Sequence, residues 1–204
     1  MAKQARVQTL PRGRHGLSRE EVVASQRARI FRAMAETMAR NGYAGTSVAD
    51  VLRTAKVSRE TFYEQFESKE DCFMSALEAA VDVVLAAAFA APPAGSTPLE
   101  RFDRGLKTYL DAIAAQPELS RLFLIEVYAA GPAALERRAA VQQRFAHVLG
   151  ATFGRRTAGD RFANEAIVAA ISSMVTARLA VGDLKGLRAL RRPLVELARR
   201  LHGG

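Results

Sequence analysis

The sequence predicts an all-α protein of about nine helices, with a small three-helix unit at its N-terminal end and a larger helical domain after it. Apolar residues recur three and four positions apart in almost every segment, which is the period of an amphipathic helix. Alanine is abundant and tryptophan is absent, a composition that favours helix over sheet. No segment alternates polar and apolar residues as a half-buried strand does. We therefore expect helices packed on helices.

The bulk properties limit the classes of protein to consider. The chain has 204 residues, enough for one domain or for two small helical units that share a core. Its net charge of +9 attracts nucleic acid, an anionic membrane surface or acidic partners. Cys72 is the one cysteine, so no internal disulfide is expected and a cytoplasmic location fits best. The N-terminus lacks the apolar stretch of a signal peptide, and the alanine-rich run 83–94 is too short to span a bilayer, so we expect no membrane partner.

The predicted helices begin after a basic N-terminal arm, residues 1–17, which contains no acidic residue. Its basic residues are Lys3, Arg6, Arg12 and Arg14. Both a solubilising tail and an arm in the minor groove of DNA fit this composition. Ser18 followed by Glu21 has the pattern of a capping box, so the first helix is expected to start there. Its apolar stripe continues to Asn41-Gly42, which ends the helix.

Two very short helices and one longer helix are expected next. Ser47 and Ser58 each precede a short segment with apolar residues at helical spacing, and Ser68 precedes a longer one, so all three are expected N-caps. Two short helices separated by a tight turn form a helix-turn-helix, which we place near residues 47–66. The predicted organisation is a basic arm over 1–17, a helix-turn-helix DNA-binding domain over 18–67 and a helical effector-binding and dimerisation domain over 68–204.

The rest of the chain follows a proline- and glycine-rich break at residues 91–98. Helical stripes recur around 99–128 and 132–153, and residues 154–160 are an expected loop. Two final helices, about 161–182 and 187–201, have apolar faces too wide for isolated surface helices. These faces require a partner surface, within the chain or on a second copy.

The second short helix has the residue types that a DNA-recognition helix needs. The residues expected to face the core are Val57, Phe62 and Phe66. The residues left on the outer faces are Arg59, Thr61, Tyr63 and Gln65. Arginine is the commonest reader of guanine edges, threonine can contact a thymine methyl or a phosphate, and a tyrosine hydroxyl can donate to a phosphate. Backbone N–H groups at helix starts can also bind phosphates, here at Ser47, Ser58 and Ser68.

Residues 46–51, TSVADV, and residues 57–71, VSRETFYEQFESKED, resemble the signature of the TetR family of transcriptional regulators. The second segment contains the pattern Tyr-x-x-Phe-x-Ser-Lys-Glu in register with the first helix, and this pattern makes the resemblance specific. It extends over about residues 18–75. The remaining chain is similar to the family only in the number and lengths of its helices.

The resemblance implies roles for individual residues. It implies phosphate contacts for Thr46, Ser47, Tyr63 and Lys69, and positions nearest the base edges for Arg59 and Thr61. Lys56 departs from the family pattern, because the turn usually has glycine there. A left-handed residue other than glycine costs about 1 kcal/mol. We expect either a distorted turn or a Lys56 side chain that faces a phosphate.

The larger domain is expected to enclose a pocket for an apolar or amphipathic small molecule with one or two polar handles. Its candidate ligand contacts, each of which also fits a structural or surface role, are Tyr109, Glu126, Tyr128, Gln142, His147 and Arg178. Glu126 and Arg178 each interrupt an apolar run. They are expected either to form a buried pair or to lie separately on solvent-facing stripes.

No pattern of a catalytic or metal site emerges from the sequence. The three histidines, His15, His147 and His202, lack the spacing of metal ligands, and there is no pair of cysteines. No glycine-rich phosphate loop follows a strand, because no strand is predicted. We therefore expect no catalytic residue, no metal and no cofactor.

The sequence favours a homodimeric transcription regulator, a repressor that a small ligand releases from a pseudo-palindromic DNA operator. The resemblance implies that the last two helices form the dimer interface. Two alternatives stay open: an all-α small-molecule-binding protein or enzyme without specific DNA binding, and a basic protein that binds membrane or nucleic acid nonspecifically through its arm. The salt dependence of binding to random duplex DNA separates the first alternative from a DNA reader.

Overall fold

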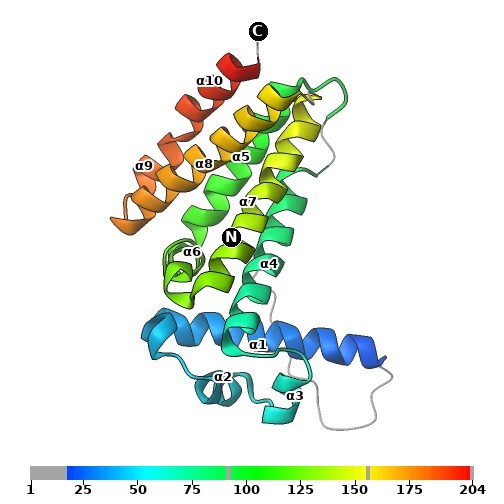
Figure 1. The fold of residues 1–204 in the computed structure, drawn as a ribbon, viewed down its shortest axis with the longest axis vertical. Coiled ribbons are helices and arrows are strands. Elements are labelled where there is room, and N and C mark those ends of the chain that lie inside the picture. Colours follow the sequence, from blue (N-terminus) through cyan, green and yellow to red (C-terminus); the bar gives the residue numbers. More distant parts are fainter. Residues whose placement is uncertain (1–17, 91–92, 155–156, 203–204) are drawn as a thin grey trace.

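The computed structural model describes residues 18–90, 93–154 and 157–202, so the predicted arm over 1–17 lies outside the described residues. Within these ranges the chain forms ten α-helices, one 3-10 helix and no strand, which confirms the all-α class. Helices α1, α2 and α3 lie at one end of an elongated bundle, and α4 leads from this end into the bundle (Figure 1). Helices α5, α7, α8 and α10 extend away from α1 toward the opposite end, whereas α6 lies next to α1.

The N-terminal helices begin at the predicted capping residues. Their bounds are α1 Arg19–Gly45, α2 Val48–Ala55, α3 Arg59–Tyr63 and α4 Lys69–Ala88. Ser18, Ser47, Ser58 and Ser68 are their N-caps, and each side chain accepts a hydrogen bond from the backbone N–H three residues on. Gly42 leaves helical geometry inside the last turns of α1, with a φ of 69°, so the regular helix ends where the sequence predicts.

The larger part of the chain has seven further helical segments among the described residues. They are α5 Pro98–Ala115, α6 Pro117–Leu124, η1 Glu126–Ala130, α7 Pro132–Phe153, α8 Ala158–Ala180, α9 Leu184–Ala189 and α10 Arg191–His202. Helix α8 starts three residues earlier than the sequence predicts, because Thr157 and Asp160 form a capping box in the expected loop.

The predicted last helix is divided at Leu190 into α9 and α10. Pro193 explains the break, because proline has no N–H to donate to the carbonyl of Ala189 and its ring clashes with that carbonyl in a continuous helix. At the end of α10, His202 is buried and stacks on Phe153 of α7 at a centroid distance of 4.1 Å. The C-terminal helices thus pack on the bundle along their length.

The buried side chains form two clusters. The first combines α1, α2, α3 and α4 with α6, η1 and the start of α7, and its residues include Phe62, Phe66, Phe73 and Phe123. The second joins α5 and α7 to α8, α9 and α10. The first cluster crosses residue 67, where the sequence analysis placed a domain boundary, so the helix-turn-helix and the bundle share one core.

Candidate nucleic-acid interface and ligand pocket

The helix-turn-helix is fixed to α1 and α4 through its apolar side. Phe62 is fully buried and Phe66 is 2% exposed, while Val57 packs against the same cluster, which confirms the predicted inward set. The guanidinium of Arg27 on α1 lies 4.6 Å from the ring centroid of Phe66. Burial on this side leaves the opposite side of α3 free to present polar groups.

Arg59 and Tyr63 form the exposed side of α3. They lie one helical turn apart, and the Arg59 guanidinium lies 5.3 Å from the centroid of the Tyr63 ring, whose residue is 44% exposed. Such a cation–π contact orients both side chains before any ligand is bound. The Thr61 hydroxyl lies 2.9 Å from that of the N-cap residue Ser58, so both hydroxyls are at the start of α3.

Gln65 is a correction to the outward set. Its side-chain amide donates to Gln26 of α1 at 3.3 Å, and its backbone carbonyl accepts from Arg27 at 3.4 Å. Gln65, two residues after the end of α3, therefore contacts α1, and Arg59, Thr61 and Tyr63 are what remains of the predicted outward set.

The turn between α2 and α3 keeps its regular shape with lysine in the glycine position. Lys56 caps α2 in the left-handed conformation, with φ 54° and ψ 48°. It has the one positive φ of any non-glycine residue in the described part of the chain. Of the two alternatives expected for Lys56, the distorted turn is not observed, and the phosphate contact of its exposed side chain stays a prediction.

Thr46 and Ser47 lie in the short connection between α1 and α2. Thr46 is 2% exposed, and its hydroxyl donates to the carbonyl of Gly42 at 2.8 Å. The Ser47 hydroxyl donates to Asp50 at 2.6 Å. Hydrogen bonds from the hydroxyl and the backbone of Ser47, together with Arg53, lower the pKa of the Asp50 carboxyl to about 2. Both hydroxyls thus have partners within the protein, and their phosphate contacts stay predictions.

Lys69 fixes the same connection from α4. Its ammonium donates to the carbonyls of Tyr43 and Thr46, both at 2.9 Å, and lies 4.2 Å from the Tyr43 ring centroid. Partial burial lowers the pKa of this ammonium. A lysine has three N–H donors, so one is left for the predicted phosphate.

A carboxylate of the bundle contacts this connection from the other side. The backbone N–H of Tyr43 donates to Glu126 of η1 at 2.5 Å. The same carboxylate lies against Gly42, where an added Cβ would be 3.2 Å from its oxygen. Residues 42–46 are thus held by Lys69 from α4 and by Glu126 from η1.

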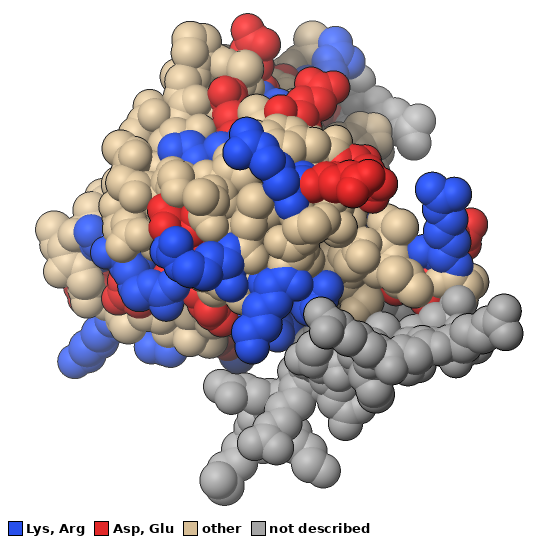
Figure 2. Space-filling model, turned by 90° about the horizontal axis from the view of Figure 1, so that it is seen from below, with Lys and Arg blue, Asp and Glu red and all other residues tan. Residues whose placement is uncertain are grey.

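The charge on this end of the molecule is mixed. Lys and Arg side chains lie across it with Asp and Glu between them (Figure 2). Residues 18–75 contain nine basic and nine acidic residues, whereas the arm over 1–17 adds four basic residues and no acidic one. The net charge of residues 18–75 is therefore zero, so the positions of individual side chains decide which of them could contact DNA.

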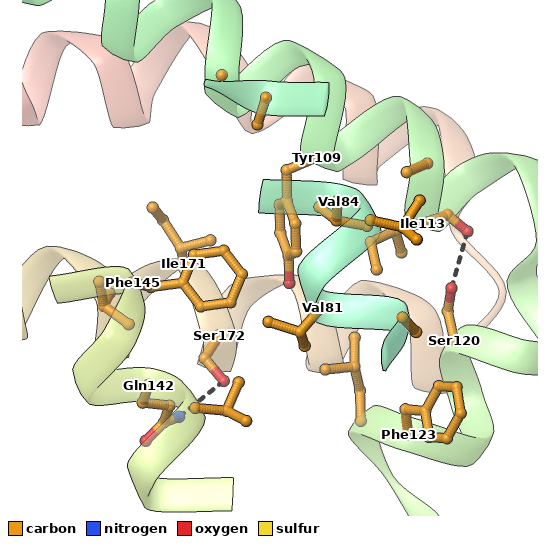
Figure 3. Close-up of a pocket in the computed structure, with 18 of the residues that line it drawn as sticks. Val81, Val84, Tyr109, Ile113, Ser120, Phe123, Gln142, Phe145, Ile171 and Ser172 are labelled. Atoms are coloured by element: carbon orange, nitrogen blue, oxygen red, sulfur yellow. Dashed lines mark hydrogen bonds between the residues drawn. The ribbon is translucent and has the colours of Figure 1, made fainter. Parts of the chain in front are cut away.

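The bundle contains an apolar cavity of about 410 Å³ where the two buried clusters meet. Helices α4, α5, α6, α7 and α8 all line it, and Figure 3 shows their side chains pointing into it. Its volume is in the range of small-molecule sites, about 300–1,000 Å³. Apolar lining side chains include Leu77, Val81, Val84, Leu106, Ile113, Phe123 and Phe145.

Two of the six predicted ligand contacts line this cavity, Tyr109 and Gln142. Burial raises the pKa of the Tyr109 hydroxyl to about 12, and the nearby charge of Arg138 partly offsets the rise. The Gln142 amide donates to Ser172 at 3.2 Å (Figure 3). Both residues come from long amphipathic helices, as the sequence predicts.

The other four candidates lie elsewhere. Glu126 is bonded to Tyr43, and Arg178 forms an ion pair with Asp183 at 3.0 Å, so the buried Glu126–Arg178 pair does not form. Tyr128 is 56% exposed, and His147 is exposed on a different part of α7. None of the four lines the apolar cavity.

Sequence reasoning missed Arg138, the one charged residue that lines the cavity among the described residues. Its guanidinium donates to Ser172 at 3.0 Å and lies 4.9 Å from the Tyr128 ring centroid. The signal was weak, because Arg137 and Arg138 are adjacent and only one of them can face the cavity. Arg137 instead pairs with Asp71 and Glu78 of α4.

The described residues show neither a metal site nor a membrane-spanning segment. No group of three or more His, Cys, Asp or Glu side chains in the described ranges lies close enough to hold a metal ion. None of the described helices combines the length and apolarity needed to cross a membrane.

The helix-turn-helix matches a known family. Residues 30–76 match the model of bacterial regulatory proteins of the tetR family, a range that contains α2, α3 and parts of α1 and α4. Over these residues the helix-turn-helix is therefore similar to the domain that defines the tetR family of bacterial regulatory proteins.

Curated relatives are similar over part of their length. The chain is 30% identical over 125 residues to the HTH-type transcriptional repressor SCO4008 of Streptomyces coelicolor, a match of 61% of this chain and 62% of the relative. It is 27% identical over 114 residues to the HTH-type transcriptional regulator RutR of Escherichia coli, over 56% and 53% of the two chains. The chain thus spans less than two thirds of the relatives it matches.

Solved structures share the whole architecture. The fatty acid degradation regulator FadR from Bacillus halodurans has a TM-score of 0.72 at 20% identity, over 88% of this chain and 95% of that one. The transcriptional regulator FadR from Bacillus subtilis, solved in complex with stearoyl-CoA, has a TM-score of 0.72 at 18% identity, over 87% and 98%. These similarities show that the fold extends beyond the helix-turn-helix to the bundle.

Proposed function

We propose that this protein is a sequence-specific DNA-binding transcription regulator, a repressor that a small molecule in the apolar cavity releases from its operator. The observation that carries the proposal is the exposed pair Arg59 and Tyr63 on a recognition helix whose other side is buried in the core. An arginine at this position can read guanine in the major groove, and the Tyr63 hydroxyl can donate to a phosphate. The similarity to the tetR family model supports the same function.

The proposed assembly is a homodimer through α8 and α10. Large apolar side chains are exposed on or next to these helices, namely Phe162, Met174, Val181 and Leu201. Phe162 is 74% and Val181 is 77% exposed, and burial of such side chains against a second copy would stabilise a dimer. Two-fold symmetry would place two recognition helices about one DNA turn apart, ~34–36 Å, on a pseudo-palindrome.

The proposed release mechanism uses the two contacts on residues 42–46. Helix α4 carries both Lys69 and the cavity residues Leu77 and Val81, and α6 carries Phe123 three residues before Glu126. A ligand that fills the cavity therefore contacts α4 and α6, the two helices that lead to the contacts on the helix-turn-helix. The ligand lowers the affinity for the operator if it binds more tightly to a conformation of the dimer in which the two helix-turn-helix units do not match the DNA half-sites. The loss of operator affinity then equals the difference in ligand-binding free energy between the two conformations. The stearoyl-CoA complex of the Bacillus subtilis regulator supports an elongated apolar ligand for a cavity of this fold.

The proposed DNA binding is tested by the salt dependence of association with random duplex DNA. We expect the logarithm of the association constant to fall with the logarithm of salt concentration by about 0.9 for each phosphate charge neutralised. Tyr63→Phe should weaken binding evenly across DNA sequences, and Tyr128→Phe is the matched control because Tyr128 is on η1, away from α3. A slope near zero would contradict DNA binding.

A further inference from the structure

The polar side chains of the apolar cavity gather at one position on its wall. Arg138 and Gln142 lie one turn apart on α7, and both donate to the hydroxyl oxygen of Ser172 on α8, at 3.0 and 3.2 Å. The charge of Arg138 also acts on the Tyr109 hydroxyl, which comes from α5. Three helices thus contribute to one polar group, defined here as the head site: Tyr109, Arg138, Gln142 and Ser172.

The head site has many donors and few acceptors. Arginine has five N–H groups, and Arg138 uses one of them on Ser172. The Ser172 oxygen already accepts two hydrogen bonds, so its own proton remains to be donated. The Tyr109 hydroxyl has no hydrogen-bond partner among the described residues. It is protonated at neutral pH, as tyrosine ordinarily is, and burial raises the pKa of this hydroxyl further, to about 12. A ligand group that fits here must mainly accept hydrogen bonds.

The charge at the cavity is positive and uncompensated. Arg138 makes no ion pair within the described part of the chain, whereas its neighbour Arg137 pairs with Asp71 and Glu78. No Asp or Glu of the described residues lines the cavity. Arg138 is half-buried next to the exposed Tyr128 ring, so the head site is near the surface end of the cavity and the apolar lining lies deeper. A half-buried charge without an ion-pair partner has lost part of its hydration, and a ligand anion at this position offsets that loss.

We propose that the ligand is an amphiphile with a carboxylate head, held by Arg138 and the donors of Tyr109, Gln142 and Ser172, and with an apolar chain in the cavity between α4, α5 and α6. This inference rests on the proposed function for the existence of an effector, and it adds the chemical class of that effector. Arginine binds a carboxylate with two parallel hydrogen bonds, which an alcohol or an amine head cannot accept.

Calorimetric titration of the full-length protein tests the head site without DNA. The probes are decanoate, 1-decanol and decylammonium, which share one chain and differ in the head. We expect decanoate to bind at least tenfold tighter than decanol, and decylammonium to bind weakest. Among octanoate, decanoate and dodecanoate, each added methylene should raise the affinity by about fourfold until the cavity is filled.

The variant Arg138→Gln removes the charge and keeps an amide at the same place. It should lose about tenfold to a hundredfold in decanoate affinity, the range for hydrogen bonds to a charged group, while its decanol affinity changes less than twofold. Arg144→Gln is the matched control, because Arg144 is on the same helix, pairs with Asp82 and does not line the cavity. Retained decanol binding shows that the Arg138 variant is folded.

Several outcomes would overturn the assignment. They are equal affinities for the acid and the alcohol, no binding of any decyl compound, or equal losses in the two arginine variants. Operator binding is measured separately, so the two proposals fail in distinguishable ways. Decanoate that binds through Arg138 but leaves operator affinity unchanged contradicts ligand-controlled release and supports the head site. Operator binding that is intact while no carboxylate binds contradicts the head site alone.

Discussion

The backbone N–H of Tyr43 donates to the carboxylate of Glu126 at 2.5 Å, across 83 positions of sequence. Tyr43 lies in the last turn of α1, after the kink at Gly42, and Glu126 begins η1, directly after the cavity helix α6. A charged acceptor on a partly buried N–H is a strong contact. This hydrogen bond therefore joins the helix-turn-helix end of the molecule to the helical bundle at one defined atom pair.

Glu126→Ala should destabilise the protein by about 1–3 kcal/mol, because it leaves the Tyr43 N–H without its acceptor. Glu126→Gln keeps an acceptor oxygen and should recover part of the loss. Denaturation by urea measures both changes. Glu118→Ala, at an exposed position of α6, is the control and should change stability by less than about 0.5 kcal/mol. Equal stability of the Glu126 and Glu118 variants would show that the contact has no energetic role.

Lys56→Gly should stabilise the protein by about 0.5–1 kcal/mol. The left-handed backbone at Lys56 strains any residue with a Cβ, and glycine relieves this strain at the cost of a more flexible unfolded chain. Thermal unfolding should show a rise of about 1–4 °C. A lower unfolding temperature would mean that the Lys56 side chain contributes more than its backbone costs.

Gly42→Ala should have the opposite sign. Gly42 has a φ of 69°, and its added Cβ would lie 3.2 Å from the Glu126 oxygen. We expect a loss of at least about 1 kcal/mol in urea denaturation. The double variant with Glu126→Ala gives a sharper result, because removal of the carboxylate should relieve the steric part of the loss. Strict additivity of the two changes would contradict the contact.

Stability in acid should depend on Asp50. The pKa of this carboxyl is about 2 in the folded protein and 3.8 ordinarily, since Ser47 and Arg53 stabilise its charged form. A lowered folded pKa adds stability that is present above the ordinary pKa and is lost as pH falls through the folded pKa. The stability difference between wild type and Asp50→Ala should therefore shrink between pH 4 and pH 2. Urea midpoints across this range measure it, and a constant difference would contradict the assignment.

The proposed dimer should depend on the exposed apolar side chains of the C-terminal helices. Phe162→Glu should place a charge in the interface and convert the protein to a monomer, because a buried unpaired charge is costly. Leu135→Glu is the control, since Leu135 is also exposed and apolar but lies on α7. Sedimentation of both variants decides the matter. A dimeric Phe162→Glu protein would contradict the proposed interface.

Local features of the structure could be predicted from the sequence, whereas contacts between distant segments could not. The N-caps at Ser18, Ser47, Ser58 and Ser68 depend on residues three positions away, so their patterns are visible in the chain. The inward set of Val57, Phe62 and Phe66 follows from helical periodicity.

The predicted ligand contacts show where prediction from the sequence ends. Tyr109 and Gln142 were placed at the cavity, but Glu126 and Arg178 found partners that periodicity does not indicate, Tyr43 and Asp183. Arg138 could not be distinguished from Arg137, because a rotation of α7 by one residue decides which arginine faces α4 and which faces the cavity. Such choices depend on tertiary packing.

The central claim, that α3 reads a specific DNA sequence, is tested most directly by selecting bound duplexes from a random DNA pool with the wild-type protein and with Arg59→Ala. For wild type we expect an inverted repeat whose half-site centres are about one DNA turn apart, roughly 34–36 Å. Arg59→Ala should relax the preference at one base pair of each half-site, with a loss of about 1–3 kcal/mol. A pool without an enriched motif, or the same motif at unchanged affinity for both proteins, would contradict the claim.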